Sequence, residues 1–128
     1  MEIGARNKVF SMEEANQLLD LVKTITKSHA EKLEPIKLKM NKMLSNDPRR
    51  KPLDRDYEFL VSQWKSKIEN IGAQVTGLWQ VEFDLGEGCL AWRYPELNLS
   101  YFRVHGDSFK ERVKLQHYIE EMDPDWAN

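Results

Sequence analysis

The stretch that decides the fold is residues 12–43, MEEANQLLDLVKTITKSHAEKLEPIKLKMNKM. Mostly apolar or small side chains recur there at alternating steps of three and four. The positions are Met12, Ala15, Leu19, Val22, Thr26, His29, Leu33, Ile36, Met40 and Met43, of which Thr26 and His29 are polar. Such steps place side chains on one stripe of an α-helix. We therefore predict a long amphipathic helix whose stripe faces a partner helix.

Local signals predict where this helix begins and where it bends. Ser11 and Glu14 have the spacing of a capping box, in which each side chain binds the backbone amide of the other residue. Pro35 has no amide hydrogen to donate to the carbonyl of Glu31, and its ring crowds that turn. We expect a kink or a break at Pro35 and a helix end near Leu44.

A turn-rich basic segment, residues 45–52, separates this helix from a second amphipathic run. Asp54 is the predicted N-cap of the second run and Gly72 its predicted end. Its apolar stripe consists of Tyr57, Val61, Trp64, Ile68 and Ile71. Two such stripes joined by a short connection predict an antiparallel helical hairpin over residues 11–72.

The hydrophobic period changes to two after Gly77. Apolar and polar side chains alternate over residues 79–85 and 90–94, and a third strand-like run covers residues 97–104. Short turns rich in glycine or proline separate the three runs. We predict a three-stranded antiparallel β-meander over residues 78–105, with a helix covering its apolar face.

A second capping-box match, from Ser108 to Glu111, precedes a final amphipathic segment. Its expected buried stripe is Leu115, Tyr118, Ile119 and Met122, and Asp123-Pro124 would end it. This segment predicts a C-terminal helix over residues 108–122. The predicted fold class is α+β, with a long antiparallel helical hairpin, the β-meander and the C-terminal helix in a single domain over residues 1–128.

Composition limits the classes of function. The net charge of −2 gives no global field to hold a polyanion, so we do not expect nucleic-acid binding. No apolar run reaches membrane-spanning length, and the first eight residues lack the apolar core of a secretory signal. Cys89 is the single cysteine, which suits a reducing compartment. We therefore expect a cytoplasmic protein with no membrane association.

No motif in the sequence predicts catalysis, a metal ion or a cofactor. None of His29, His105 and His117 lies three or four positions from another histidine or from the cysteine, the spacing of metal ligands on one helix. No nucleophile elbow is present. The sequence therefore predicts no metal site and no cofactor, and whether the chain is an enzyme stays open.

Arginines and aromatic residues gather in the predicted sheet region. Arginine forks beside aromatic rings can hold a carboxylate or a phosphate. In the alternative, these arginines pair with Glu82, Asp84 and Glu96 on a solvated face of the sheet. The candidate ligand-binding residues are Glu82, Trp92, Arg93, Tyr101, Arg103 and Arg112.

Several short motifs carry a resemblance to a known family. They are FSMEEANQLL at residues 10–19, Ile71-Gly72, VEF at 81–83, LAWR at 90–93, YFR at 101–103 and SFKER at 108–112. They resemble, over roughly residues 9–112, the DUF2203 family of uncharacterised prokaryotic proteins, which implies a similar order of helices and strands but no established activity. Glu82, Ala91 and Arg103 stand where the family pattern has Asp, Cys and His. Cys89 and His105 each lie two positions away, so partial replacement of such a trio is an open alternative.

Two hypotheses of function follow. In the first, the chain is a protein-interaction or assembly module, because the first helix is longer than the second and part of its stripe needs other cover. Residues 12–43 would then pair with a second copy, forming a homo-oligomer, or with a protein partner. In the second, the chain binds a small molecule or an anion, as a binder or an enzyme, around Arg93, Arg103 and Arg112.

Overall fold

The computed structural model describes residues 8–122. Its helices are α1 (Met12–Asn41), α2 (Arg50–Ile71), the short 3-10 helix η1 (Phe109–Glu111) and α3 (Leu115–Met122). Its strands are β1 (Gln74–Gly77), β2 (Gln80–Asp84), β3 (Gly88–Arg93), β4 (Tyr101–Val104) and β5 (Val113–Lys114). They form one antiparallel sheet in the order β1-β2-β3-β4-β5. The α+β class is confirmed, but the sheet in this part of the chain has five strands instead of three.

Helix α1 begins where the sequence predicts. The Ser11 hydroxyl accepts a hydrogen bond from the Glu14 amide at 3.0 Å, and the Glu14 carboxylate accepts one from the Ser11 amide at 2.9 Å. The helix then continues through Pro35, so the expected break is wrong. Pro35 and Glu31 are both exposed, and water can therefore bind the carbonyl that the proline leaves without a donor.

The stripe of α1 faces α2, as predicted. Its buried members are Ala15, Leu19, Val22, Thr26, His29 and Leu33. Trp64 and Ile68 are the buried residues of α2. A hydrogen bond of 2.8 Å from the Trp64 indole nitrogen to the Thr26 hydroxyl joins the two helices in this seam. The two helices therefore supply much of each other's cover.

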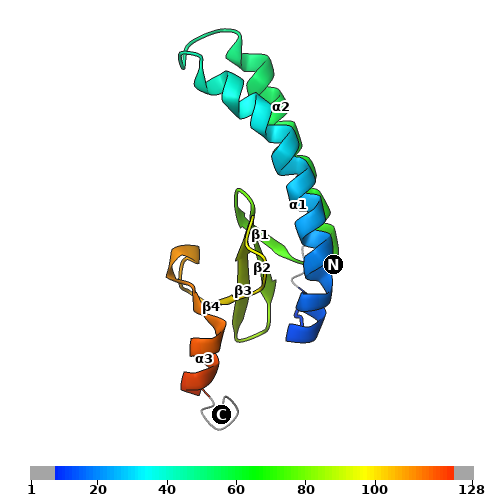
Figure 1. The fold of residues 1–128 in the computed structure, drawn as a ribbon, viewed down its shortest axis with the longest axis vertical. Helices are drawn as coiled ribbons and strands as arrows, with labels where there is room; N and C mark the ends of the chain where they lie inside the picture. Colours follow the sequence, from blue (N-terminus) through cyan, green and yellow to red (C-terminus); the bar gives the residue numbers. More distant parts are fainter. Residues whose placement is uncertain (1–7, 123–128) are drawn as a thin grey trace, which may run out of the picture.

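Helix α2 begins at Arg50, earlier than the predicted cap at Asp54. The Asp47 carboxylate accepts the Arg49 amide at 2.9 Å and so holds the turn that leads into the helix. Pro52 then falls in the first turn, where a missing amide hydrogen costs no helical bond. The far half of the hairpin, built from the end of α1 and the start of α2, extends well beyond the sheet (Figure 1).

One face of the sheet packs on the hairpin. Val81, Phe83, Leu90, Trp92 and Phe102 lie on this face and join Leu19, Val22, Trp64 and Ile68 in the core. Strands β1 and β5 lie at the two edges of the sheet. They have four and two residues, too few to show a period of their own.

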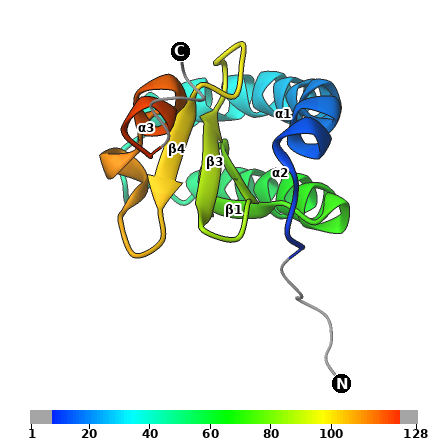
Figure 2. The same ribbon diagram turned by 90° about the horizontal axis from the view of Figure 1, so that it is seen from below.

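The predicted C-terminal helix over 108–122 is wrong over residues 108–114, nearly half of its length, because α3 begins only at Leu115. The capping box of Ser108 and Glu111 is present, but it caps only the single turn of η1. Arg112 then has an extended backbone, with φ −60° and ψ 144°, which leads into β5. Helix α3 follows and lies beside β4 (Figure 2), where Tyr118 stacks on Phe102 with ring centroids 4.0 Å apart. The predicted stop at Asp123-Pro124 lies outside the described residues.

Candidate functional site on the outer face of the sheet

The face of the sheet opposite the hairpin carries charged and polar side chains. Cross-strand partners point to the same face, and the register pairs Asp84 with Cys89, Cys89 with Arg103, and Glu82 with Ala91. Although no helix of the hairpin covers this face, Glu82, Cys89 and Ala91 are at most 1% exposed. Other side chains must therefore cover them.

Arg103 covers Glu82 through a two-pronged ion pair. Its Nε lies 2.6 Å from one carboxylate oxygen and its Nη2 lies 2.7 Å from the other. Its Nη1 donates to the Asp107 carbonyl at 2.7 Å, and its Nη2 lies 3.6 Å from the Cys89 sulfur. The hydrogen bonds to Glu82 raise the pKa of Arg103 above its ordinary value. The buried carboxylate therefore has a permanent counter-charge.

Arg112 forms a second, separate ion pair. Its guanidinium donates to both oxygens of Glu96 and, at 3.0 Å, to the Ala91 carbonyl. It also stacks on the rings of Tyr101 and Phe109, 4.1 and 4.6 Å from their centroids. Partial burial raises the pKa of Glu96, but the hydrogen bonds from Arg112 and the Arg93 amide outweigh it, so the pKa lies below its ordinary value.

The six candidate ligand-binding residues fall into different environments. Glu82 pairs with Arg103, and Tyr101 packs against Arg112. Trp92 lies on the opposite face, in the core, where its indole nitrogen donates to the Glu96 carbonyl at 2.8 Å. Arg93 is exposed. A role for these residues in ligand binding stays a prediction. In the structure, Arg103 pairs with Glu82 and Arg112 pairs with Glu96, as the alternative interpretation expects.

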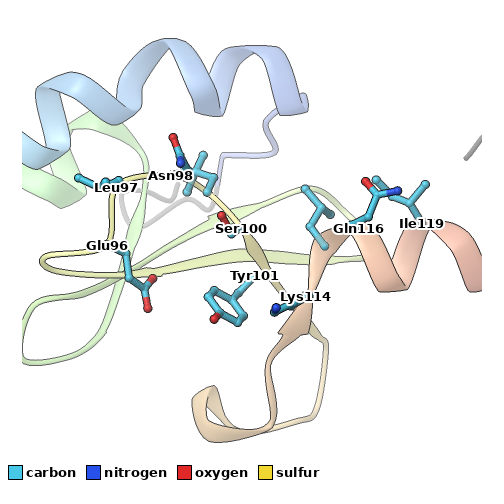
Figure 3. A pocket seen from close by; sticks show the side chains of 10 residues that line it. Glu96, Leu97, Asn98, Ser100, Tyr101, Lys114, Gln116 and Ile119 are labelled. Carbon is cyan, nitrogen blue, oxygen red and sulfur yellow. The ribbon is translucent and has the colours of Figure 1, made fainter.

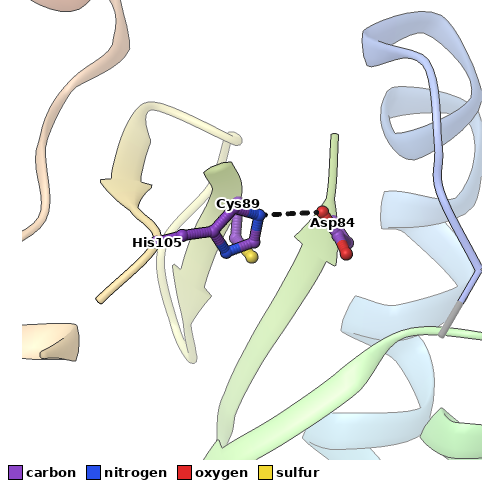
Figure 4. A group of neighbouring side chains, drawn as sticks. All are labelled: Asp84, Cys89 and His105. Carbon is purple, nitrogen blue, oxygen red and sulfur yellow. Dashed lines mark ion pairs between the residues drawn. The ribbon is translucent and has the colours of Figure 1, made fainter. Parts of the chain in front are cut away.

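A third group joins Asp84 to Cys89 and His105, which the sequence left open as partial replacements and which are not among the six candidate ligand-binding residues. Asp84, Cys89 and His105 each present one donor atom, and these atoms all lie within 4.8 Å of one another (Figure 4). The His105 Nε2 lies 3.4 Å from an Asp84 oxygen and 3.1 Å from the Gly86 carbonyl. The signal that could have found this group is the tight turn between β2 and β3, which makes Asp84 and Cys89 cross-strand neighbours.

Cys89 is not prepared to act as a nucleophile. Burial, followed by the negative charge of Glu82, raises the pKa of its thiol to about 11. A thiol with this pKa is protonated at neutral pH, whereas thiolate is the reactive form. The Cys-His-Asp group therefore does not have the electrostatics of a cysteine hydrolase.

A comparison with protein families decides the relationship of the chain. The model of the family described as uncharacterized conserved proteins, DUF2203, matches residues 8–115. The chain belongs to the DUF2203 family. Searches of curated proteins and of solved structures found no match. Within residues 8–122, no helix is both long and apolar enough to cross a membrane.

The sheet register relates two trios in this DUF2203 chain. Strand faces repeat every two residues, and each member of the trio Asp84, Cys89 and His105 lies two residues from Glu82, Ala91 or Arg103. All three shifts run toward the same end of the sheet. The donor trio therefore stands one repeat along the strands from Glu82, Ala91 and Arg103.

A cavity of about 620 Å³ opens at the β4 and β5 edge of this DUF2203 protein. It lies between the segment after β3 and the start of α3 (Figure 3). Its lining mixes polar and apolar side chains from Glu96, Leu97, Asn98, Leu99, Ser100, Tyr101, Lys114, Leu115, Gln116 and Ile119. Tyr101 is the candidate ligand-binding residue that lines it and also contacts Arg112.

Proposed function

We propose that this protein is an assembly module in which the far half of the hairpin, residues 34–63, pairs with the same segment of a second copy. The observation that carries the proposal is the burial pattern. The stripe of α1 is buried only as far as Leu33, and α2 is buried only from Trp64 onward. The thirty residues between them include no buried residue, although their stripe continues through Ile36, Met40 and Met43.

Within the projecting arm the two helices cover each other only in part, since Ile36, Met40 and Met43 are half-buried. Helix α1 has 30 residues, so it is about 45 Å long. Isolated helices are marginal in water, and they are held mainly by packing of an apolar face. Leu38, Leu44 and Phe59 in the arm are 52%, 77% and 65% exposed. A second arm would turn this pair of helices into a four-helix bundle, a stable arrangement for such stripes.

The outer surface of α2 suits contact with an identical surface. A shallow hollow of about 360 Å³ on this surface is lined by Phe59, Ser62, Gln63, Ser66 and Lys67. Steps of three and four place Phe59, Ser62 and Ser66 on one face of the helix. In a two-fold dimer each Phe59 can enter the hollow of the other copy, because the same patch serves both sides.

The test is the mass of the protein in solution, measured by sedimentation equilibrium over a range of concentrations. We expect a dimer for the native chain and a monomer for Phe59→Lys. Burial of each phenylalanine contributes about 1.5–3 kcal/mol, so the loss of two weakens the dimer by at least about 100-fold. The matched control is Leu97→Lys, since Leu97 is 72% exposed in the loop after β3. A native chain that stays monomeric, or equal weakening by both substitutions, refutes the proposal.

A second candidate function is the binding of a small anion around Arg93, Arg103 and Arg112. The observation that favours it is the cavity beside Tyr101, whose lining includes Lys114 and Glu96, the carboxylate that pairs with Arg112. A carboxylate or phosphate ligand should raise the melting temperature by mass action. The Lys114→Ala variant should lose that shift, and a panel of carboxylates and phosphates without effect on the native chain would remove this candidate.

A further inference from the structure

Three strands bring three different donor atoms to one point on the outer face. Asp84 ends β2, Cys89 lies at the start of β3, and His105 follows the end of β4. A carboxylate oxygen, a thiol sulfur and an imidazole nitrogen lie within 4.8 Å of one another there (Figure 4). Three ligands around one ion need this degree of proximity.

We propose that Asp84, Cys89 and His105 form a binding site for a divalent transition-metal ion of the Zn²⁺ type. Sulfur and imidazole donors select transition metals, whereas Ca²⁺ and Mg²⁺ prefer oxygen donors alone. Zn²⁺ accepts one ligand of each of these three kinds in a tetrahedral arrangement. Three protein ligands leave the fourth position open to water or to another ligand.

The surroundings of the trio hold two of its members in place. The Gly86 amide donates to an Asp84 oxygen at 2.7 Å and so orients the carboxylate. The Arg103 guanidinium donates toward the Cys89 sulfur at 3.6 Å. Such outer contacts orient metal ligands and tune their donor strength. Asp84 and Cys89 are therefore oriented by their neighbours. Cys89 lies on β3, between Asp84 at the end of β2 and His105 after the end of β4.

The charges of the site balance around a divalent cation. Arg103 is neutralised by Glu82, whose carboxylate it binds at both oxygens. When the ion binds, it displaces the Cys89 thiol proton to solvent, and the resulting thiolate and the Asp84 carboxylate contribute two negative charges to the ion. The approach is open on one side, because the His105 side chain is 47% exposed while that of Asp84 is 14% exposed. An ion can therefore enter from solvent past the imidazole.

The bound ion would also link parts of the sheet. It would tie the turn between β2 and β3 to the end of β4, two segments that the contact of His105 with the Gly86 carbonyl also joins. Binding to the folded chain alone raises its stability by mass action. Zn²⁺ should therefore raise the melting temperature of the full chain.

The experiment is a Co²⁺ titration of the full chain after treatment with a chelator, followed by absorption spectroscopy and by competition with Zn²⁺. We expect one equivalent of Co²⁺, a thiolate-to-cobalt charge-transfer band and the visible bands of tetrahedral cobalt. Cys89→Ser should abolish the charge-transfer band. His105→Gln should weaken binding by about tenfold or more, since loss of even an outer contact weakens metal binding by about 10–100-fold.

The matched control is His117→Gln. His117 lies 3.7 Å from Glu121 on α3 and forms another exposed histidine–carboxylate pair. Its substitution should leave the Co²⁺ spectrum and affinity unchanged. Because Cys89 is buried, circular dichroism must first show that the Cys89→Ser variant is folded. If Cys89→Ser does not fold, the exposed His105→Gln variant provides the test. The proposal is overturned if the native chain gives no charge-transfer band, or if His105→Gln binds Co²⁺ as tightly as the native chain or no more weakly than His117→Gln.

Discussion

The hydrogen bond between Trp64 and Thr26 should stabilise the hairpin seam by an amount that substitution can measure. Both side chains are 0% exposed, and the indole nitrogen lies 2.8 Å from the hydroxyl oxygen. Thr26→Val keeps nearly the same volume but leaves the indole N–H buried without an acceptor. An unsatisfied buried donor costs about 1–3 kcal/mol. At about 4 °C per kcal/mol for a chain of this size, the melting temperature should fall by about 4–12 °C.

The assay is urea unfolding followed by far-UV circular dichroism. An unchanged slope of the unfolding free energy against urea concentration shows that both proteins unfold in the same two-state manner. Thr24→Val is the matched control, because Thr24 is exposed on the same helix and should change stability by less than about 0.5 kcal/mol. In a Trp64→Phe background there is no N–H to orphan, so Thr26→Val should cost almost nothing there. Equal costs of Thr26→Val in both backgrounds would refute the reasoning.

Three further predictions concern other parts of the chain. His29 is 2% exposed and its Nε2 has no hydrogen-bond partner among residues 8–122, so His29→Leu should stabilise the protein by about 1 kcal/mol in the same assay; a lower denaturation midpoint would contradict this. An added Cβ at Gly88 would lie 2.3 Å from Phe102 Cζ and 2.7 Å from the Arg103 carbonyl, so Gly88→Ala should destabilise by about 1–3 kcal/mol, and an unchanged melting temperature would be the contrary result. The folded pKa of Glu96 lies below the ordinary 4.5, so its stabilising contribution is complete above that pH and is lost as the pH falls through the folded value. Glu96→Gln should therefore be less stable than the native chain at pH 7, with a gap that narrows in acid; a gap independent of pH would contradict the prediction.

The order and type of the main elements followed from local patterns. The 3-4 spacing of the α1 stripe needs only the helical period, and it identified Leu19, Val22 and Leu33 as buried. The Ser11 and Glu14 box needs only residues three apart. A period of two likewise identified β2 and β3. These features depend on contacts within a few residues, so a single sequence encodes them directly.

The tertiary structure decided what depends on contact between distant segments. Strands β1 and β5 are too short to carry a period and exist because a neighbouring strand supplies their hydrogen bonds. Arg112 reaches Glu96, and Arg103 reaches Glu82, only because the sheet register brings them together across 16 and 21 positions. The same register gathers Asp84, Cys89 and His105 into one group. The physical reason is that hydrophobic period and capping are local properties, whereas register is set by the packing of the whole sheet on the hairpin.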